Sequence, residues 1–196
     1  MAKFYDGMCR TYAHSWQAAH WSSHESQQGH FAILARLARL GPDDRILDVG
    51  CGQGDLLGYL RDAGMSAHYT GTDVSPEMIA RAGERFPGGR FLVGDFLADS
   101  FAEPFDWVLA AGTFNHRVEG EDQEAYLRRA LGKMYELARR GAGALLLSGY
   151  DPHRRAESYL YGYDPATVLR LALELTPHVT LDHAAMPSSF AVFLYR

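Results

Sequence analysis

Ile46-Leu47-Asp48-Val49-Gly50-Cys51-Gly52-Gln53-Gly54 is the most informative segment of this chain. A short apolar run ends at an acid and passes into three glycines at alternate positions, and a helical pattern begins near Asp55. This order predicts a buried strand, a tight turn and a helix. Glycine adopts positive φ and has no Cβ to obstruct a ligand. At the carboxyl edge of an open α/β sheet, such a loop is a candidate nucleotide site. The alternative is a purely structural turn.

The spacing of these glycines separates the loop from two other phosphate-binding loops. It is G-x-G-x-G, whereas the dinucleotide fingerprint requires a glycine where Asp55 stands. No Gly-Lys-Ser/Thr follows the loop, so the Walker pattern is also absent.

Two further predicted strands end at acids that a nucleoside could use. Residues 68–74 read as a second strand ending near Asp73, which lies 23 residues past Gly50, where an acid can reach a ribose hydroxyl pair. Residues 90–94 read as a third strand, and Asp95 and Phe96 follow it. We expect Asp95 to accept a hydrogen bond from an adenine amino group while Phe96 packs on the base.

The next two strand ends carry the candidate catalytic residues. The predicted fourth strand, residues 105–110, leads to Asn115 and His116. Asn115 could hold a substrate amine or the amino-acid part of a cofactor by its side-chain carbonyl, and His116 could be a general base near neutral pH. The alternative is a loop-capping asparagine and a solvated histidine. Tyr150 ends the predicted fifth strand and is a candidate substrate contact.

In this order and spacing, the motifs resemble those of the class I S-adenosylmethionine (SAM)-dependent methyltransferases, over residues 30–196. The resemblance is to the small-molecule type, because no inserted block is large enough for a separate substrate domain. It implies an α/β fold, with a doubly wound, mostly parallel, seven-stranded Rossmann-like sheet, helices on both faces and an antiparallel last strand. It also implies SAM as the cofactor. The cofactor-binding residues are then expected to be Asp48, Gly50, Cys51, Gly52, Gly54, Asp73, Val74, Met78, Asp95, Phe96 and Ala111.

The remaining elements follow from periodicity and from proline and glycine signals. Helices are predicted over residues 28–40, 121–139 and 165–175. Strands are predicted over residues 142–150, 179–185 and 190–195. We expect residues 28–196 to be the SAM-binding catalytic domain and residues 1–27 to be a separate aromatic lid segment.

The lid segment is unusually rich in aromatic residues and histidines. Similar small-molecule methyltransferases carry a tyrosine-bearing lid at this place, and we expect Tyr5 and Tyr12 to be the lid contacts to the ligand. Such a lid would exclude water from the sulfonium. Trp16 and Trp21 are weaker candidates, and the histidines are expected on the surface. The alternative is an amphipathic helix whose rings simply pack on the sheet.

Composition and charge limit the partners. The chain has 196 residues, which suits one domain, and a net charge of −5, which argues against nucleic acid. No apolar run is long enough to span a bilayer, so no membrane partner is expected. Two cysteines form no disulfide framework or metal-binding pattern. We expect a cytoplasmic protein without a metal, and a homodimer is one possible assembly.

These observations predict a SAM-dependent methyltransferase that acts on a small molecule by in-line transfer from the sulfonium. One alternative is a SAM-consuming cyclase of the same fold, in which SAM alone reacts to give azetidine-2-carboxylate and methylthioadenosine. A second alternative is a non-catalytic SAM-binding module. Analysis of the adenosine by-product separates transfer from cyclisation.

Overall fold

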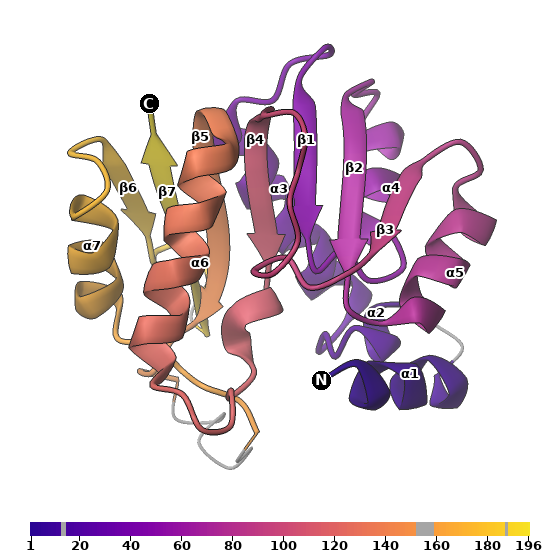
Figure 1. The fold of residues 1–196 in the computed structure, drawn as a ribbon, viewed down its shortest axis with the longest axis horizontal. Coiled ribbons are helices and arrows are strands. Elements are labelled where there is room, and N and C mark those ends of the chain that lie inside the picture. Colours follow the sequence, from indigo (N-terminus) through magenta and orange to yellow (C-terminus); the bar gives the residue numbers. More distant parts are fainter. Residues whose placement is uncertain (13–14, 152–158, 187) are drawn as a thin grey trace.

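The structure, a computed structural model, describes residues 1–12, 15–151, 159–186 and 188–196. A seven-stranded sheet with the order β3-β2-β1-β4-β5-β7-β6 forms its centre (Figure 1). Strand β7 runs antiparallel to both neighbours, β5 and β6, whereas the pairs among β1 to β5 are parallel. The strands are β1 (Arg45–Val49), β2 (His68–Asp73), β3 (Arg90–Val93), β4 (Phe105–Ala111), β5 (Ala138–Leu147), β6 (Val179–Asp182) and β7 (Ser189–Tyr195). The predicted fold class is confirmed.

Helices cover both faces of this sheet (Figure 1). Helices α3 (His24–Ala38), α4 (Asp55–Asp62) and α5 (Pro76–Arg85) pack on one face, and α6 (Gln123–Leu137) and α7 (Pro165–Leu173) pack on the other. Helices α1 (Ala2–Thr11) and α2 (Ser15–Ala18) lie across the carboxyl edge of the parallel strands, near the short helix η1 (Thr113–Asn115).

Each face buries its own apolar layer. Beneath α3 and α4 the layer includes Phe31, Leu34 and Leu56, and beneath α6 it includes Leu127 and Leu131. All five side chains are at most 3% exposed, and burying such a side chain stabilises the fold by about 1.5–3 kcal/mol. The central strands are therefore buried on both sides, as a parallel sheet requires.

Side-chain caps fix where the helices begin. Ser23, Ser75 and Asp122 accept hydrogen bonds from backbone N–H groups in the first turns of α3, α5 and α6. Asp164 does the same for α7, which has Pro165 at its first position, as predicted.

Several predicted boundaries are wrong. The helix predicted at residues 28–40 begins at His24, because Ser23 caps it four residues earlier than expected. This helix therefore crosses the expected border between lid segment and catalytic domain. The helix predicted to run to residue 139 ends at Leu137, and Ala138 already pairs with Phe105 in the sheet. Strand β5 ends at Leu147 rather than at residue 150, and β6 ends at Asp182 rather than at residue 185.

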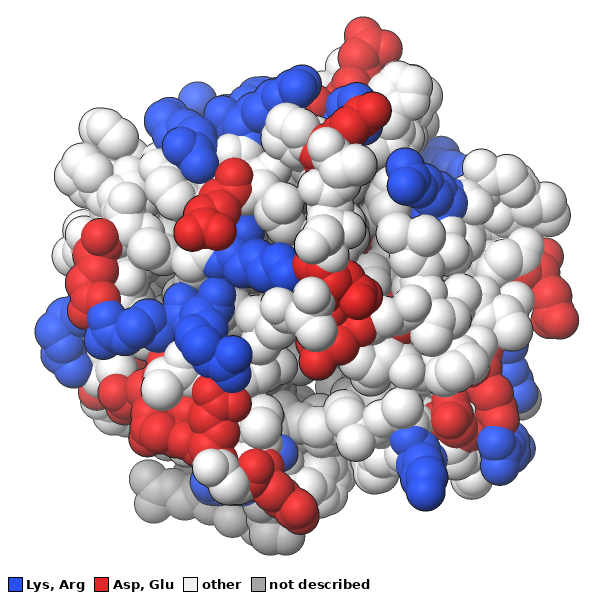
Figure 2. Space-filling model, in the orientation of Figure 1, with Lys and Arg blue, Asp and Glu red and all other residues white. Residues whose placement is uncertain are grey.

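Charged side chains of both signs lie among one another on the face seen in Figure 2. Among the described residues, no helix has the length and the apolar composition needed to cross a membrane.

Candidate functional site

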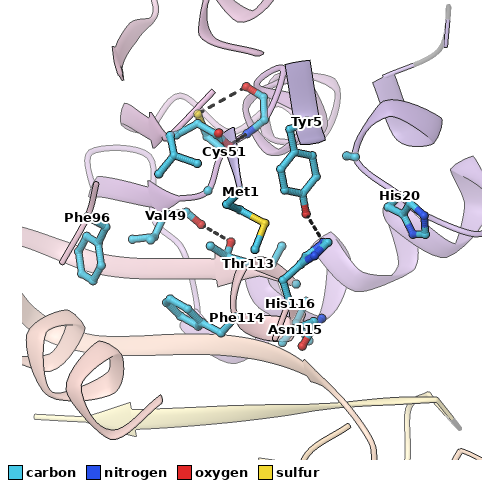
Figure 3. A pocket seen from close by; sticks show the side chains of 18 of the residues that line it. Met1, Tyr5, His20, Val49, Cys51, Phe96, Thr113, Phe114, Asn115 and His116 are labelled. Atoms are coloured by element: carbon cyan, nitrogen blue, oxygen red, sulfur yellow. Dashed lines mark hydrogen bonds between the residues drawn. The ribbon is translucent and has the colours of Figure 1, made fainter. Parts of the chain in front are cut away.

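A pocket of about 870 Å³ opens at the carboxyl edge of the sheet. It falls within the range of roughly 300–1,000 Å³ typical of small-molecule sites. The glycine loop, the ends of β2 and β4, helix η1 and the lid segment supply its walls (Figure 3). Every residue expected to bind the cofactor lines this pocket except Gly54.

The glycine loop needs glycine for reasons of both backbone and space. Gly50, Gly52 and Gly54 have φ values of +70°, +54° and +77°. A Cβ at Gly50 would lie 2.3 Å from Oγ1 of Thr113. Thr113 cannot easily yield, because its hydroxyl donates a 2.6 Å hydrogen bond to the carbonyl of Val49. The loop therefore leaves open backbone where β1 meets α4.

Asp73 lies beside this loop at the end of β2. Its Oδ2 accepts from the Gly52 N–H at 2.9 Å, and its Oδ1 accepts from the Ser75 N–H at 2.9 Å. Burial raises the pKa of this carboxyl, and the backbone hydrogen bonds oppose that rise. Val74 follows it with 36% of its surface exposed, so an apolar face adjoins the acid.

Asp48 and Cys51 lie behind the loop. Asp48 is 2% exposed and its Oδ2 accepts from the hydroxyl of Tyr69 at 2.6 Å. Burial raises the pKa of Asp48 to about 7. Burial also raises the pKa of the Cys51 thiol, so this sulfur is not a thiolate nucleophile at neutral pH.

Asp95 and Phe96 line the pocket beyond β3. Asp95 is exposed, and its Oδ1 accepts from the Leu97 N–H at 2.9 Å. Phe96 is 6% exposed and packs in the layer under α6, where the Lys133 Nζ lies 5.2 Å from its ring centroid. Asp95 is thus placed to face a ligand, and the Phe96 ring forms part of the floor.

At the end of β4, Asn115 and His116 line the pocket (Figure 3). The Asn115 side-chain carbonyl accepts from the Leu147 N–H at 3.0 Å, which uses one of its two lone pairs. Burial lowers the pKa of His116 to about 4. The prediction of a base poised near neutral pH is therefore wrong for His116, which is neutral and weakly basic.

Five rings from four segments close the pocket over these residues: Phe4, Tyr5, His20, His116 and Tyr159. The Tyr5 hydroxyl lies 2.8 Å from Nε2 of His116 (Figure 3), and the Tyr159 hydroxyl lies 2.9 Å from Nε2 of His20. Burial raises the pKa of Tyr5, so its hydroxyl stays protonated and can donate to the neutral His116 ring.

The helix that carries Tyr5 is anchored to α5. The Ser75 hydroxyl donates to Asp6 at 2.5 Å, the Cys9 thiol donates to the Met78 sulfur at 3.3 Å, and Arg10 pairs with Glu77. These contacts place α1 directly across the pocket mouth.

Tyr12 and Tyr150 are placed elsewhere. They are 38% and 68% exposed, and neither is among the described residues that line the pocket. Tyr12 is the C-cap residue of α1, and Tyr150 lies beyond the end of β5. His14 and the loop residues 152–158 lie outside the described residues.

Several lining residues were missed from the sequence. Tyr159 was not among the expected site residues and His20 was expected on the surface, yet both line the pocket. Gln27 and His30 also line the pocket, on the inner side of α3. Both are polar residues at positions of α3 that face inward. Helical periodicity could have identified these positions once the start of α3 was known.

Comparison with known proteins gives a consistent result. Residues 46–141 match a family model described as a methyltransferase domain. The chain is 36% identical over 129 residues to Rv1506c of Mycobacterium tuberculosis, a protein assigned to the methyltransferases, and the match covers 64% of this chain and 76% of that protein. It is 34% identical over 108 residues to the trans-aconitate 2-methyltransferase of Streptomyces avermitilis, covering 50% of this chain but only 40% of that relative.

A solved structure shows the same fold over nearly the whole chain. The N-methyltransferase NodS of Bradyrhizobium japonicum, in complex with S-adenosylhomocysteine, superposes with a TM-score of 0.68 at 19% identity, covering 98% of each chain. The family model and the mycobacterial relative extend the likeness from the fold to the sequence. The chain belongs to the class I SAM-dependent methyltransferases.

Proposed function

We propose that this protein transfers the methyl group of SAM to a small-molecule acceptor. The observation that carries the proposal is one pocket of about 870 Å³ that runs from the glycine loop and Asp73 to the wall formed by η1, α3 and the lid segment. The first part fits a cofactor, and the second part offers room for an acceptor.

The residues of the first part fit SAM. Gly50 and Gly52 both line the pocket, and the position of a Cβ at Gly52 is open, with the Met78 sulfur 3.9 Å away, which leaves room for a ligand beside the loop. Asp73 keeps acceptor lone pairs for ribose hydroxyls while its two backbone hydrogen bonds fix its position. The Thr72 hydroxyl, which is buried and lines the pocket, has no hydrogen-bond partner among the described residues, as expected where a ligand supplies one.

The lid segment supports the proposed reaction by excluding water. When bound, SAM supplies an electrophilic methyl group whose leaving group is a neutral thioether. Little help is then needed beyond positioning and a dry site. Tyr5 and Phe4 cover the pocket beside His116, and the contacts of α1 with α5 hold them there.

The volume of the pocket favours transfer over cyclisation. A cyclase acting on SAM alone needs no second chamber, whereas this pocket extends past η1 to Trp21, His30 and Ser189. Polar groups on that distant wall are unnecessary for a reaction within one molecule of SAM.

The by-product of SAM consumption tests the proposal. The protein is incubated with SAM carrying a trideuterated methyl group, first alone and then with a metabolite extract, and the products are identified by mass. Transfer requires S-adenosylhomocysteine and a labelled acceptor that appear only with the extract. Methylthioadenosine formed from SAM alone would establish the cyclase, and SAM binding without turnover in either incubation would favour the non-catalytic module.

A further inference from the structure

The pocket has a second built polar site on the wall opposite Asp73, formed by α3 and the start of β7. The Leu147 N–H donates to Asn115, Leu147 pairs with Ser189 across β5 and β7, and Ser189 contacts His30 on α3. These contacts form a continuous wall from the end of β4 to α3. Asn115, Leu147, Ser189 and His30 all line the pocket.

Hydrogen bonding fixes the tautomer of His30. Its Nδ1 lies 2.6 Å from the backbone carbonyl oxygen of Ser26, one helical turn earlier. A carbonyl oxygen only accepts, so Nδ1 must carry a proton. In the neutral ring Nε2 is then an acceptor, and it lies 3.2 Å from the Ser189 hydroxyl. His30 and Ser189 are 8% and 4% exposed, so this pair is held within the protein.

The packing around His30 holds the ring in place. The Trp21 ring stands edge-on to it, with centroids 4.6 Å apart. Gln27, one turn before it on α3, donates to Asp55 at 2.9 Å, and Arg85 also pairs with Asp55. Asp55 therefore already accepts from two donors.

The chemistry of this wall selects an acceptor. Most of its side chains are apolar, which suits an acceptor molecule that is itself largely apolar. These apolar residues are Trp21, Phe31, Leu145, Leu147 and Leu160. A carboxylate acceptor would require a cation beside this wall. The arginines among the described lining residues are Arg117 and Arg129, and the Met1 ammonium also lines the pocket, near His116 on the side of the lid segment. Arg129 is paired with Glu121, and the Arg117 guanidinium lies 5.0 Å from the Tyr161 ring centroid.

Resting on the proposed methyl transfer, we infer that the Ser189–His30 pair is the acceptor subsite and that it takes a neutral hydroxyl on an apolar small molecule. As the acceptor oxygen forms its bond to the methyl carbon, the C–S bond breaks and its electron pair stays on sulfur. The acceptor proton passes to Ser189 Oγ while the Ser189 proton passes to His30 Nε2. The imidazolium that results keeps its Nδ1–H bond to Ser26.

His30 acts through Ser189 and is therefore a positioning and proton-accepting residue. Another histidine at the pocket, His116, already has its Nε2 hydrogen-bonded to the Tyr5 hydroxyl. A general base contributes roughly 10²–10⁴-fold in rate. His30→Gln should lower kcat by about 100-fold or more. Kd for SAM should stay within about twofold, since the contacts to Asp73 and the glycine loop are untouched.

The test has two parts, and both use the full chain. In the first, the labelled acceptor from the trideuterated SAM incubation is treated with alkali and analysed by mass. An alkali-stable ether supports the inference. An alkali-labile methyl ester or an N-methyl product overturns it while leaving methyl transfer intact, and the absence of any labelled acceptor counts against methyl transfer itself.

In the second part, kcat and KM are measured with that acceptor for His30→Gln, Ser189→Ala and the control His24→Gln. His24 is exposed at the start of the same helix, so its change should leave kcat as in the unaltered protein. If His30→Gln does not fold, Ser189→Ala decides the question, with an expected loss of at least about tenfold in kcat. Unchanged kcat in a folded His30→Gln or Ser189→Ala variant, or a Kd for SAM that weakens by the same factor as kcat falls, would overturn the inference.

Discussion

Asp73→Ala tests the cofactor end of the pocket most directly. The carboxylate is held by the N–H groups of Gly52 and Ser75, so its position is set before any ligand binds. A hydrogen bond to a charged group contributes about 1.5–3 kcal/mol, and two ribose hydroxyls would donate to this carboxylate. Water replaces part of this loss, so we expect SAM binding to weaken by about 2–4 kcal/mol, which is roughly 30- to 700-fold in Kd.

The same change has a structural component that must be measured separately. Alanine leaves the Gly52 and Ser75 N–H groups without their carboxylate, and the resulting loss of about 1–2 kcal/mol would lower Tm by several degrees. Calorimetry gives Kd for SAM, and thermal unfolding without ligand gives the stability. Asp95→Asn is the matched control, because Asp95 is exposed and the replacement keeps an acceptor for the Leu97 N–H, so its loss in SAM affinity should be smaller. A folded Asp73→Ala variant that binds SAM within twofold of the unaltered protein would refute the assignment of the ribose to Asp73.

Three further perturbations address the loop, the lid segment and the buried acid. Gly50→Ala places a Cβ against Thr113 at a φ of +70°, so it should lower stability by about 1–3 kcal/mol and abolish measurable SAM binding, as checked by thermal unfolding and calorimetry. Tyr5→Phe leaves Nε2 of His116 without its hydroxyl partner, so limited proteolysis within residues 1–27 should become faster and SAM should protect less. The folded state raises the pKa of Asp48 to about 7, so between about pH 4 and pH 7 the folded protein binds more protons than the unfolded chain. The free energy of unfolding therefore falls as pH rises through that window. Asp48→Asn removes this group and should flatten the decline in Tm between pH 5 and pH 8.

Each of these three has an outcome that contradicts it. A Gly50→Ala protein with normal SAM affinity would mean that the loop does not approach the cofactor. Tyr12→Phe is the control for Tyr5→Phe because its ring is exposed, and equal proteolysis of the two variants would mean that Tyr5 does not hold the lid segment closed. An unaltered pH slope in Asp48→Asn would show that another group causes the decline.

Local sequence signals predicted which residues meet at the carboxyl edge of the sheet. Alternate glycines after an apolar run dictate a strand, a turn and a helix, and an acid at the end of the next strand must reach the same sheet edge when the strands are parallel. Gly50, Asp73 and Asp95 therefore line one pocket in the structure. No long-range information was required, because parallel strands and short loops place these positions together.

The acceptor half was harder to predict because it depends on burial and on partners far away in the sequence. Asn115 turns its carbonyl to Leu147, 32 residues later, and His116 has its pKa lowered by burial under the lid segment. Neither effect is visible in a motif of two residues. Tyr159 reaches His20 across 139 residues, so its ligand-facing place follows only from how the lid segment and the loop after β5 meet.

The direction of β7 links the fold to the proposed acceptor subsite. Because β7 is antiparallel, its first residue, Ser189, lies beside the last residue of β5, Leu147, at the carboxyl edge of the sheet. A parallel last strand would bring its opposite end to this edge, and His30 would then face a different side chain. The antiparallel strand was expected from the family resemblance, whereas the pairing of Ser189 with a helical histidine 159 residues away is seen only in the structure. Substrate choice in this protein is therefore expected to depend on α3 and β7 rather than on the motifs that identify the cofactor.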